Sequence, residues 1–202
     1  MTAAATTPKG ERRRATLVEA AAELLAEGGF DAVRHRAVAE RAGLPLASTT
    51  YYFDSLEDLV TAAVEHHSQV ELANGRQQLE ELATRNRGVQ ATVELVLDLL
   101  LGPPSGDPEA DAEAVLLRYE RLVATGRRPY LRPLMRTLSD QLNELLLAIF
   151  TRSGTPVTPA ELEKLVALVD GAVVNALIAI DPAPRAAAAR MLQAALAESH
   201  SA

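Results

Sequence analysis

The stretch from Arg34 to Phe53, which reads RHRAVAERAGLPLASTTYYF, gathers the side chains with the most evident binding chemistry. Its second half carries three hydroxyls and two phenols but no acid. Hydroxyl and phenol groups donate hydrogen bonds to phosphate oxygens, and a short helix that bears them fits a groove of DNA. The stretch is therefore a candidate DNA-contacting segment.

Two short helices would have to position these side chains. The first is expected over Arg36–Arg41, and Gly43 supplies the turn, because glycine enters left-handed backbone conformations without steric cost. Pro45 suits the first position of a second helix, since its φ is fixed and its missing N–H is not needed there. That second helix would carry the hydroxyls and rings from Ser48 to Tyr52.

The composition predicts an all-α fold. The 202 residues are 48% hydrophobic and only 3% aromatic, and Leu, Ala and Val supply most of the apolar side chains. These residues recur at helical spacing, and no segment shows sustained strand alternation. The chain is long enough for one or two domains, and we expect about nine helices. It has no cysteine, which excludes disulfides and thiol chemistry.

The charge is unevenly distributed along the chain. The net charge of −7 argues against a protein that coats nucleic acid without specificity. From Lys9 to Tyr52 there are seven basic and six acidic residues, so this quarter is about neutral while the remainder is acidic. A DNA-binding face would therefore need its arginines gathered on one side.

Helical periodicity divides the rest of the chain. A disordered arm is expected over residues 1–9, then a helix that ends at Gly28 and Gly29. The fourth helix should begin near Leu56 and end at Asn74, because Gly75 follows. The other expected helices cover about 11–27, 89–100, 108–125, 131–150, 159–180 and 188–196.

The helix expected from Pro159 to about Ile180 is apolar on nearly all sides. Thr158 and Glu161 form a capping box at its start. A helix that is apolar all round must be buried on two sides, so its second side meets either a partner chain or the centre of a monomeric bundle. Asp170 and Asn175 interrupt the apolar surface, and we expect them to pair across a dimer or to line a pocket, because unpaired burial costs roughly 1–3 kcal/mol.

The segment GGFDAVRHRAVAERAGLPLASTTYYFDSLEDLV is similar to the N-terminal signature of tetracycline-repressor-type (TetR) transcriptional regulators. Val38–Gly43 matches the family's I-A-x-x-A-G helix, and the motif resemblance covers about residues 10–70. The chain departs from the pattern at Arg34, where a capping Thr is usual, and at Leu56, where a phosphate-binding Lys is usual. The resemblance implies an arm at 1–9, a helix-turn-helix domain at 10–54 and a ligand-binding and dimerisation domain at 55–202.

The resemblance also implies a DNA-binding set on the two short helices. We expect Leu46, Thr49 and Thr50 to make an apolar and hydroxylic reading surface, so that specificity comes from thymine methyl contacts and DNA shape. The alternative for the two tyrosines is that they close the small three-helix core. Arg12, Arg13 and Arg14 are either a DNA-contacting arm or a solvated helix start. The implied DNA-binding residues are Arg36, Leu46, Ala47, Ser48, Thr50, Tyr51 and Tyr52.

Two further sets follow from the family's architecture. A pocket among the fifth to eighth helices would bind an apolar effector, although large apolar residues at such positions are more often plain core. The last two helices would pair with those of a second copy in a homodimer. The implied ligand-binding residues are Leu97, Leu116, Tyr119, Leu138, Leu142 and Phe150, and the implied dimer-interface residues are Asp170, Gly171, Val174, Asn175, Met191 and Ala195.

Other chemistries find little support in the sequence. His66 and His67 are adjacent on a helix and point about 100° apart, so they do not chelate a metal together. No catalytic triad, phosphate loop or paired-carboxylate motif is present, so we expect no enzyme activity and no cofactor. No apolar run suits a signal peptide or a membrane span, which favours the cytoplasm.

Together with these patterns, the resemblance implies a ligand-responsive transcriptional regulator. It would act as a repressor that binds a pseudo-palindromic double-stranded DNA operator as a dimer. The alternative is a helical small-molecule-binding or adaptor protein that has lost DNA binding. The acidic net charge and the missing lysine at position 56 keep that alternative open.

Overall fold

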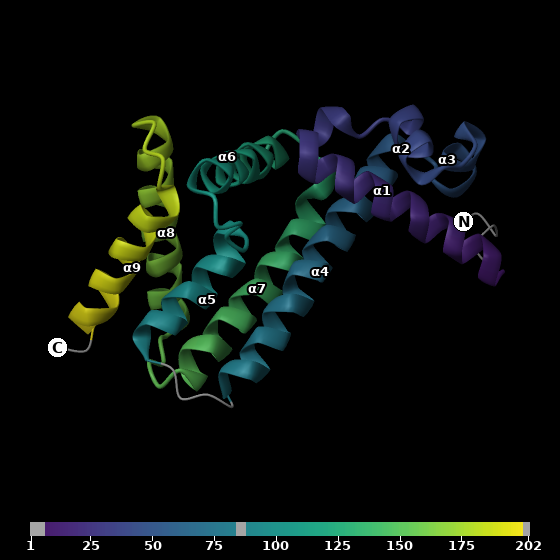
Figure 1. Ribbon diagram of the computed structural model, residues 1–202. Helices are drawn as coiled ribbons and strands as arrows, with labels where there is room; N and C mark the ends of the chain where they lie inside the picture. The colour runs from purple at the N-terminus through teal and green to yellow at the C-terminus, as the bar shows by residue number, and fades with distance from the viewer. Residues whose placement is uncertain (1–6, 84–87, 200–202) are drawn as a thin grey trace. The chain divides into compact units, whose positions relative to one another are not determined.

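The computed structural model describes residues 7–83 and 88–199 of the chain (Figure 1). Within them there are nine α-helices, a short 3-10 helix (η2) and no strand, so the predicted all-α class is confirmed. The elements in chain order are α1 (Pro8–Ala32), α2 (His35–Ala42), α3 (Leu46–Tyr52), α4 (Leu56–Ala83), α5 (Val89–Leu101), α6 (Pro108–Thr125), η2 (Pro129–Leu131), α7 (Arg132–Arg152), α8 (Pro159–Ile178) and α9 (Pro184–Ser199).

The helices fall into two compact units. Unit 1 combines Met1–Val70 with Tyr119–Leu138, and unit 2 combines Glu71–Arg118 with Ser139–Ala202. Unit 1 is thus made from two separate stretches of sequence. The domain boundary expected after residue 54 stays a prediction.

In unit 1, α1 begins earlier than the sequence pattern indicates. Thr7 caps it, since the Thr7 hydroxyl accepts a hydrogen bond from the backbone N–H of Gly10 at 3.1 Å, and Pro8 occupies the first turn. The expected arm at 1–9 is therefore wrong at its end, while residues 1–6 lie outside the described residues. The expected break after the helix is confirmed, because Gly28 and Gly29 both leave helical geometry.

The fourth helix is longer than expected, and Gly75 lies within it rather than ending it. A Cβ atom at Gly75 would lie 2.3 Å from a methyl carbon of Leu99 and 2.9 Å from one of Leu145. These contacts are too short for any side chain without displacing the leucines. The glycine is therefore explained by the close approach of α5 and α7, a tertiary constraint that sequence punctuation does not reveal.

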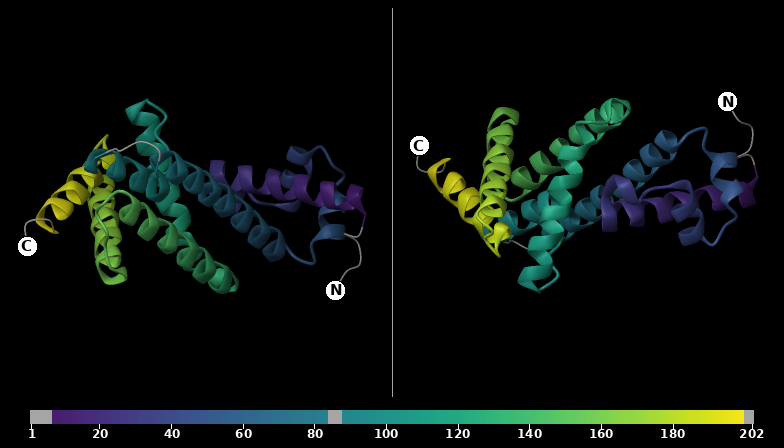
Figure 2. Two further views of the ribbon diagram at one scale, coloured as in Figure 1. Left: turned by 90° about the horizontal axis from the view of Figure 1, so that it is seen from below. Right: turned by 90° about the horizontal axis from the view of Figure 1, so that it is seen from above.

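In unit 2, α8 and α9 pack against each other as a helical hairpin, and α9 also packs on α5 (Figures 1 and 2). The predicted capping box is present at the start of α8. The Thr158 hydroxyl accepts from the Glu161 N–H at 3.3 Å, and the Thr158 N–H donates to the Glu161 carboxylate at 2.7 Å. The buried side of α8 consists of Leu162, Leu165, Val169, Val173 and Ala176.

We expect Thr158→Ala to lower the free energy of unfolding by about 1 kcal/mol, because α8 would begin without its side-chain cap. Urea unfolding followed by circular dichroism, at one fixed protein concentration, measures the change. Thr158→Ser keeps the hydroxyl and should behave like the unaltered protein. Equal stability of the alanine and serine variants would contradict the role of the cap.

The charge of Glu161 gives this cap a pH dependence. Hydrogen bonds from the Thr158 N–H and hydroxyl lower the pKa of Glu161 below its ordinary value of 4.5. Its contribution is therefore present above pH 4.5 and is lost as the pH falls through the lowered pKa. The stability difference between the unaltered protein and Glu161→Gln should shrink over that range.

Candidate nucleic-acid interface and ligand cavity

The turn between α2 and α3 depends on one left-handed residue. Gly43 has φ 63° and ψ 29°, as the sequence predicts. Its N–H donates to the Glu40 carbonyl at 3.2 Å, and the Leu44 N–H donates to the Ala39 carbonyl at 3.0 Å. These bonds satisfy the last carbonyls of α2. Arg34 provides no side-chain cap at the other end of α2, also as expected.

One side of α3 is buried in the three-helix core. Thr49 is 0% exposed, and its hydroxyl donates to the Leu46 carbonyl at 2.8 Å. Val38 and Phe53 are buried with it. The expectation that Thr49 belongs to the DNA-reading surface is therefore wrong. With only seven residues, α3 is too short for a repeating apolar pattern, so its buried side could not be assigned from the sequence.

The opposite side of α3 is exposed and carries no charge. Leu46 and Tyr51 are 52% and 58% exposed, so the alternative in which Tyr51 closes the core is not supported. The Tyr52 ring is half-buried and meets the Tyr51 ring edge to face, with centroids 5.0 Å apart. Of the remaining predicted DNA-binding residues on α3, Ala47 and Thr50 are exposed and Ser48 is half-buried.

Arg36 projects from α2 with an exposed side chain. Its Nε donates to the Glu40 carboxylate at 3.0 Å, one helical turn further on. Ion pairs of this kind between exposed groups are weak. Arg36 can therefore exchange Glu40 for another anion, such as a phosphate, at little cost.

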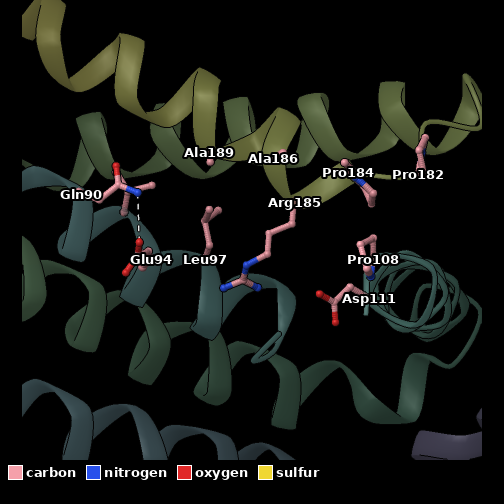
Figure 3. A pocket seen from close by; sticks show the side chains of 12 residues that line it. Gln90, Glu94, Leu97, Pro108, Asp111, Pro182, Pro184, Arg185, Ala186 and Ala189 are labelled. Carbon is pink, nitrogen blue, oxygen red and sulfur yellow. Dashed lines mark hydrogen bonds between the residues drawn. The ribbon is translucent and has the colours of Figure 1, made fainter. Parts of the chain in front are cut away.

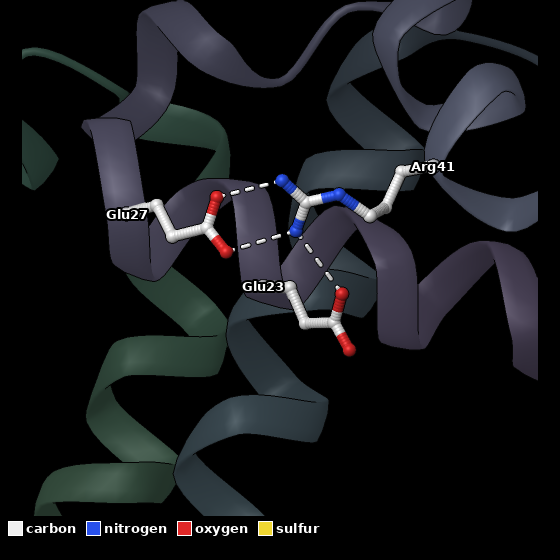
Figure 4. Close-up of polar contacts among 3 residues, drawn as sticks. All are labelled: Glu23, Glu27 and Arg41. Carbon is white, nitrogen blue, oxygen red and sulfur yellow. Dashed lines mark hydrogen bonds and ion pairs between the residues drawn. The ribbon is translucent and has the colours of Figure 1, made fainter.

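Arg41 has a different role, which the sequence analysis missed (Figure 4). Its guanidinium donates to Glu27 with two bonds of 2.9 and 2.7 Å and to Glu23 with one of 3.1 Å. Hydrogen bonding to Arg41 lowers the pKa of Glu27, and the two carboxylates raise the pKa of Arg41. Glu23 and Glu27 lie one turn apart on α1, and this spacing was the one sign in the sequence that both could pair with a single cation. Their meeting with Arg41 depends on how α1 and α2 cross.

Two more arginines of unit 1 lie over aromatic rings. The Arg14 guanidinium is 5.0 Å from the centre of the Phe53 ring, and that of Arg128 is 3.8 Å from the centre of the Phe30 ring. Such contacts are electrostatically favourable. Arg14 therefore helps to hold α1 on the end of α3, and within the run Arg12–Arg14 it does more than begin a solvated helix.

Unit 2 contains a cavity of about 290 Å³ bounded by α5, the start of α6 and the start of α9 (Figure 3). Its walls are mainly aliphatic and proline side chains. Charged groups enter it at Glu94, Asp111 and Arg185. The lining residues are Gln90, Val93, Glu94, Leu97, Pro108, Asp111, Pro182, Ala183, Pro184, Arg185, Ala186 and Ala189.

Only Leu97 of the expected ligand-binding set lines this cavity. Leu116 and Leu142 are half-buried elsewhere in unit 2, and Phe150 is completely buried. Tyr119 and Leu138 belong to unit 1 and are buried there. The sequence pointed to large side chains, whereas small alanines and prolines at the start of α9 leave this space open.

Arg185 connects α9 to the end of α5. Its guanidinium donates to the Gly102 carbonyl at 2.6 Å and also to the Asp98 carboxylate. The Arg185 and Asp98 side chains are only 21% and 22% exposed. Burial raises the pKa of Asp98, while Arg185 opposes that shift.

The outer side of α8 is exposed and partly apolar. Val174 is 42% and Ile178 is 76% exposed, and both lie on the side opposite Val169 and Val173. The expected interface residues Asp170, Gly171, Asn175 and Met191 are likewise exposed, and Ala195 is half-buried.

The described part of the chain has neither a candidate metal site nor a candidate membrane span. No group of three or more His, Cys, Asp or Glu residues is placed to hold a metal ion there. None of its helices is long and apolar enough to cross a membrane.

Two protein-family models match the chain. Residues 17–63 match the model described as bacterial regulatory proteins, tetR family. Residues 87–198 match the model described as tetracyclin repressor-like, C-terminal domain, which is more than half of the chain. No curated protein sequence matches.

Several solved structures share the fold. The multidrug binding protein EbrR, solved in complex with ethidium, is 28% identical with a TM-score of 0.65, and the match covers 91% of this chain and 98% of that one. A TetR-family member from Streptomyces coelicolor A3 is 26% identical with a TM-score of 0.60, covering 91% and 97%. A TetR regulator from Haloarcula marismortui is 19% identical with a TM-score of 0.65, covering 93% and 98%, and supports the fold alone.

We expect Arg185→Met to lower the free energy of unfolding by about 1–3 kcal/mol, because Asp98 would keep its burial and lose its cation. Because burial raises the pKa of Asp98, the contribution of this residue to stability is present at low pH and is lost as the pH rises through that pKa. The loss should therefore be largest at neutral pH and shrink in acid. Urea unfolding across this pH range measures it.

Arg190→Met, on the exposed side of the same helix, is the matched control and should change stability little. If the two methionine variants lost equal stability at every pH, the Arg185–Asp98 contact would not stabilise the fold.

Proposed function

The chain belongs to the tetracycline-repressor family of bacterial regulatory proteins, and we propose that it represses transcription by binding a pseudo-palindromic operator as a homodimer. A small effector would release it from the DNA. The observation that carries this proposal is the uncharged, exposed side of α3, held by a buried core in a helix-turn-helix. We place this activity in the cytoplasm, where the DNA lies.

The exposed side of α3 supports groove binding of a particular kind. Leu46 and Ala47 offer apolar contacts to thymine methyl groups, while Thr50 offers a hydroxyl to base edges. Ser48, Tyr51 and Tyr52 would donate hydrogen bonds to phosphates. With no arginine on α3, specificity would come from methyl contacts and DNA shape more than from bidentate guanine contacts.

The arginines near α3 would share the electrostatic part of binding. Arg36 is held by one weak, exposed pair, so it is available to a phosphate. Arg41 is held by two carboxylates of α1, so we assign it to the scaffold. Binding by few cations would have a shallow salt dependence.

The outer side of α8 supports the homodimer. An exposed apolar surface that includes Val174 and Ile178 is unfavourable in water and favours a partner. Gly171 would allow the close approach of a second helix, since space is open where its side chain would be. Asp170, Asn175, Met191 and Ala195 would complete this interface. A two-fold axis here would present two α3 helices to half-sites one helical turn, or a multiple, apart.

The C-terminal helices would bind the effector. EbrR, which is similar over most of its length, was solved with ethidium, proflavin and malachite green, and this supports a small-molecule site in unit 2. The effector needs only a higher affinity for the state that does not bind DNA, with a coupling of about 1–3 kcal/mol.

Selection of genomic DNA fragments by the purified protein tests the proposal. A pseudo-palindrome should be enriched among the bound fragments. The alternative, an adaptor that has lost DNA binding, predicts no enriched sequence. Family members are typically DNA-binding proteins rather than enzymes, so we expect no turnover in the absence of DNA.

We expect Arg36→Ala and Tyr51→Phe to weaken binding to the selected DNA without unfolding the protein, because both side chains are exposed. The arginine variant should reduce the salt slope of log K by about 1. The phenylalanine variant should lose one hydrogen bond, worth about 1 kcal/mol or roughly five-fold in affinity. Fluorescence anisotropy at several salt concentrations measures both.

Arg132→Ala removes an exposed arginine outside the helix-turn-helix and is the control for net charge. If it changed the salt slope as much as Arg36→Ala did, or if neither DNA-face variant changed binding, α3 and α2 would not form the DNA-binding face.

We expect Val174→Glu to convert the dimer to a monomer, because a carboxylate buried at a helix–helix interface is costly. Light scattering after size-exclusion chromatography measures the mass. Val123→Glu is the matched control, since Val123 is 73% exposed and lies on α6. A dimer that survives Val174→Glu would place the interface elsewhere.

A further inference from the structure

A second hollow of unit 2 lies between the C-terminal half of α4 and the end of α5 (Figure 1). Its volume is about 360 Å³, and the range for small-molecule pockets begins at roughly 300 Å³. It is separate from the cavity beside α9, because the two share no lining residue. This hollow is called the α4–α5 groove below.

The base of the α4–α5 groove is apolar. Gly75 of α4 and Leu99 of α5 are buried, while the other lining residues are half-buried or exposed. Gly75 lets Leu99 approach the backbone of α4, since a Cβ atom there would lie 2.3 Å from a Leu99 methyl carbon. The C–H groups of a ligand can pack on this base and leave water.

The α4 wall of the groove is rich in amides. Asn74, Gln77 and Gln78 line it, and their spacing of three and four residues places them on one side of the helix. Each amide offers both donors and acceptors. None of the three side chains is hydrogen-bonded to another described residue. Their hydrogen-bonding capacity is therefore available to a ligand.

Two of the three carboxylates that line the groove already have arginine partners. Arg118 of α6 donates to both oxygens of Glu71 and to the Leu99 carbonyl at 3.0 Å. Arg185 of α9 donates to Asp98. The third carboxylate is that of Glu81. An ionised carboxylate has about four acceptor sites, so Glu71 and Asp98 can each accept a further hydrogen bond.

The charges of the groove favour a neutral ligand. Among the described residues, no arginine, lysine or histidine lines it, so an anion would meet carboxylates without a cation. A cation would meet carboxylates whose charge is largely offset by Arg118 and Arg185. What remains is a set of hydrogen-bond donors and acceptors above an apolar base.

We propose that the α4–α5 groove binds a small uncharged polyhydroxylated ligand, of the size of a monosaccharide or a cyclitol. Its hydroxyls would donate to the carboxylates of Glu71 and Asp98 and exchange hydrogen bonds with the three amides of α4. Its C–H face would lie on Leu99. Binding of this ligand stands on the groove alone, whereas a role for it as the effector would rest on the function proposed above.

Titration of neutral and charged probes tests the class of ligand. D-Glucose, D-galactose, D-mannose, D-ribose and myo-inositol are the neutral probes, putrescine is the cation and gluconate is the anion. Each is added to the full-length protein without DNA, and NMR signals of the Leu99 methyls and the Gln77 and Gln78 amides are followed. At least one neutral probe should give saturable shifts and bind more tightly than either ion. Its affinity should be the same at low and high salt, because no charge is paired.

Variants with matched controls test the site. Asn74→Trp fills the groove and should abolish binding of that neutral probe, whereas Ala73→Trp, at an exposed neighbouring position outside the lining, should not. Gln77→Leu and Gln78→Leu each remove an amide and should weaken binding roughly five-fold. Gln90→Leu makes the same change at an exposed position outside the groove and should leave affinity unchanged. Circular dichroism establishes that each variant is folded.

Three results would overturn the proposal. They are the absence of a saturable shift with all five neutral probes, tighter binding of putrescine or gluconate than of any neutral probe, and unchanged binding in both leucine variants of α4. Anisotropy with the selected DNA is measured separately, with and without the neutral probe. An occupied groove in a protein that binds no DNA would remove the proposed function and keep this site, and DNA binding with an empty groove would do the reverse.

Discussion

The left-handed backbone at Gly43 is the constraint on which the candidate DNA face depends. It sets the direction in which the chain leaves α2, and hence which side of α3 meets the core. With that direction fixed, Thr49 is completely buried, while Tyr51 is exposed to solvent. A side chain at position 43 would meet no atom, so the requirement is one of backbone conformation alone. The choice of which side of α3 is exposed is thus made at Gly43, three residues before α3 begins.

The net charge of −7 is compatible with a local DNA face because carboxylates and arginines are paired by position. Glu23 and Glu27 are both paired with Arg41, which joins α1 to α2 and offsets part of their negative charge. Arg36 has only Glu40 as its partner, and both are exposed. An arginine with two carboxylate partners, such as Arg41, therefore holds helices together. An exposed arginine with one partner, such as Arg36, can exchange that partner for another anion.

The sequence was sufficient for whatever depends on local spacing, and insufficient where distant segments meet. The capping box at Thr158, the turn at Gly43 and the all-α class follow from neighbours along the chain, and the structure agrees with each. Gly75 was misread because the leucines that crowd it come from α5 and α7. The cavity was missed for a related reason, since its shape comes from small residues of α9 facing α5, and the sequence pattern favoured large ones.

Unit 1 is built from two separate stretches of sequence, and this affects the order in which it can fold during translation. Tyr119–Leu138 contributes Leu131, which is completely buried, and Arg128, which covers the Phe30 ring. During synthesis, the first 70 residues are translated before these partners. The helix-turn-helix helices can form early, because their contacts are local, but their core is closed only when residues 119–138 emerge. Chain order therefore delays the maturation of the DNA-binding unit until much of unit 2 has been translated.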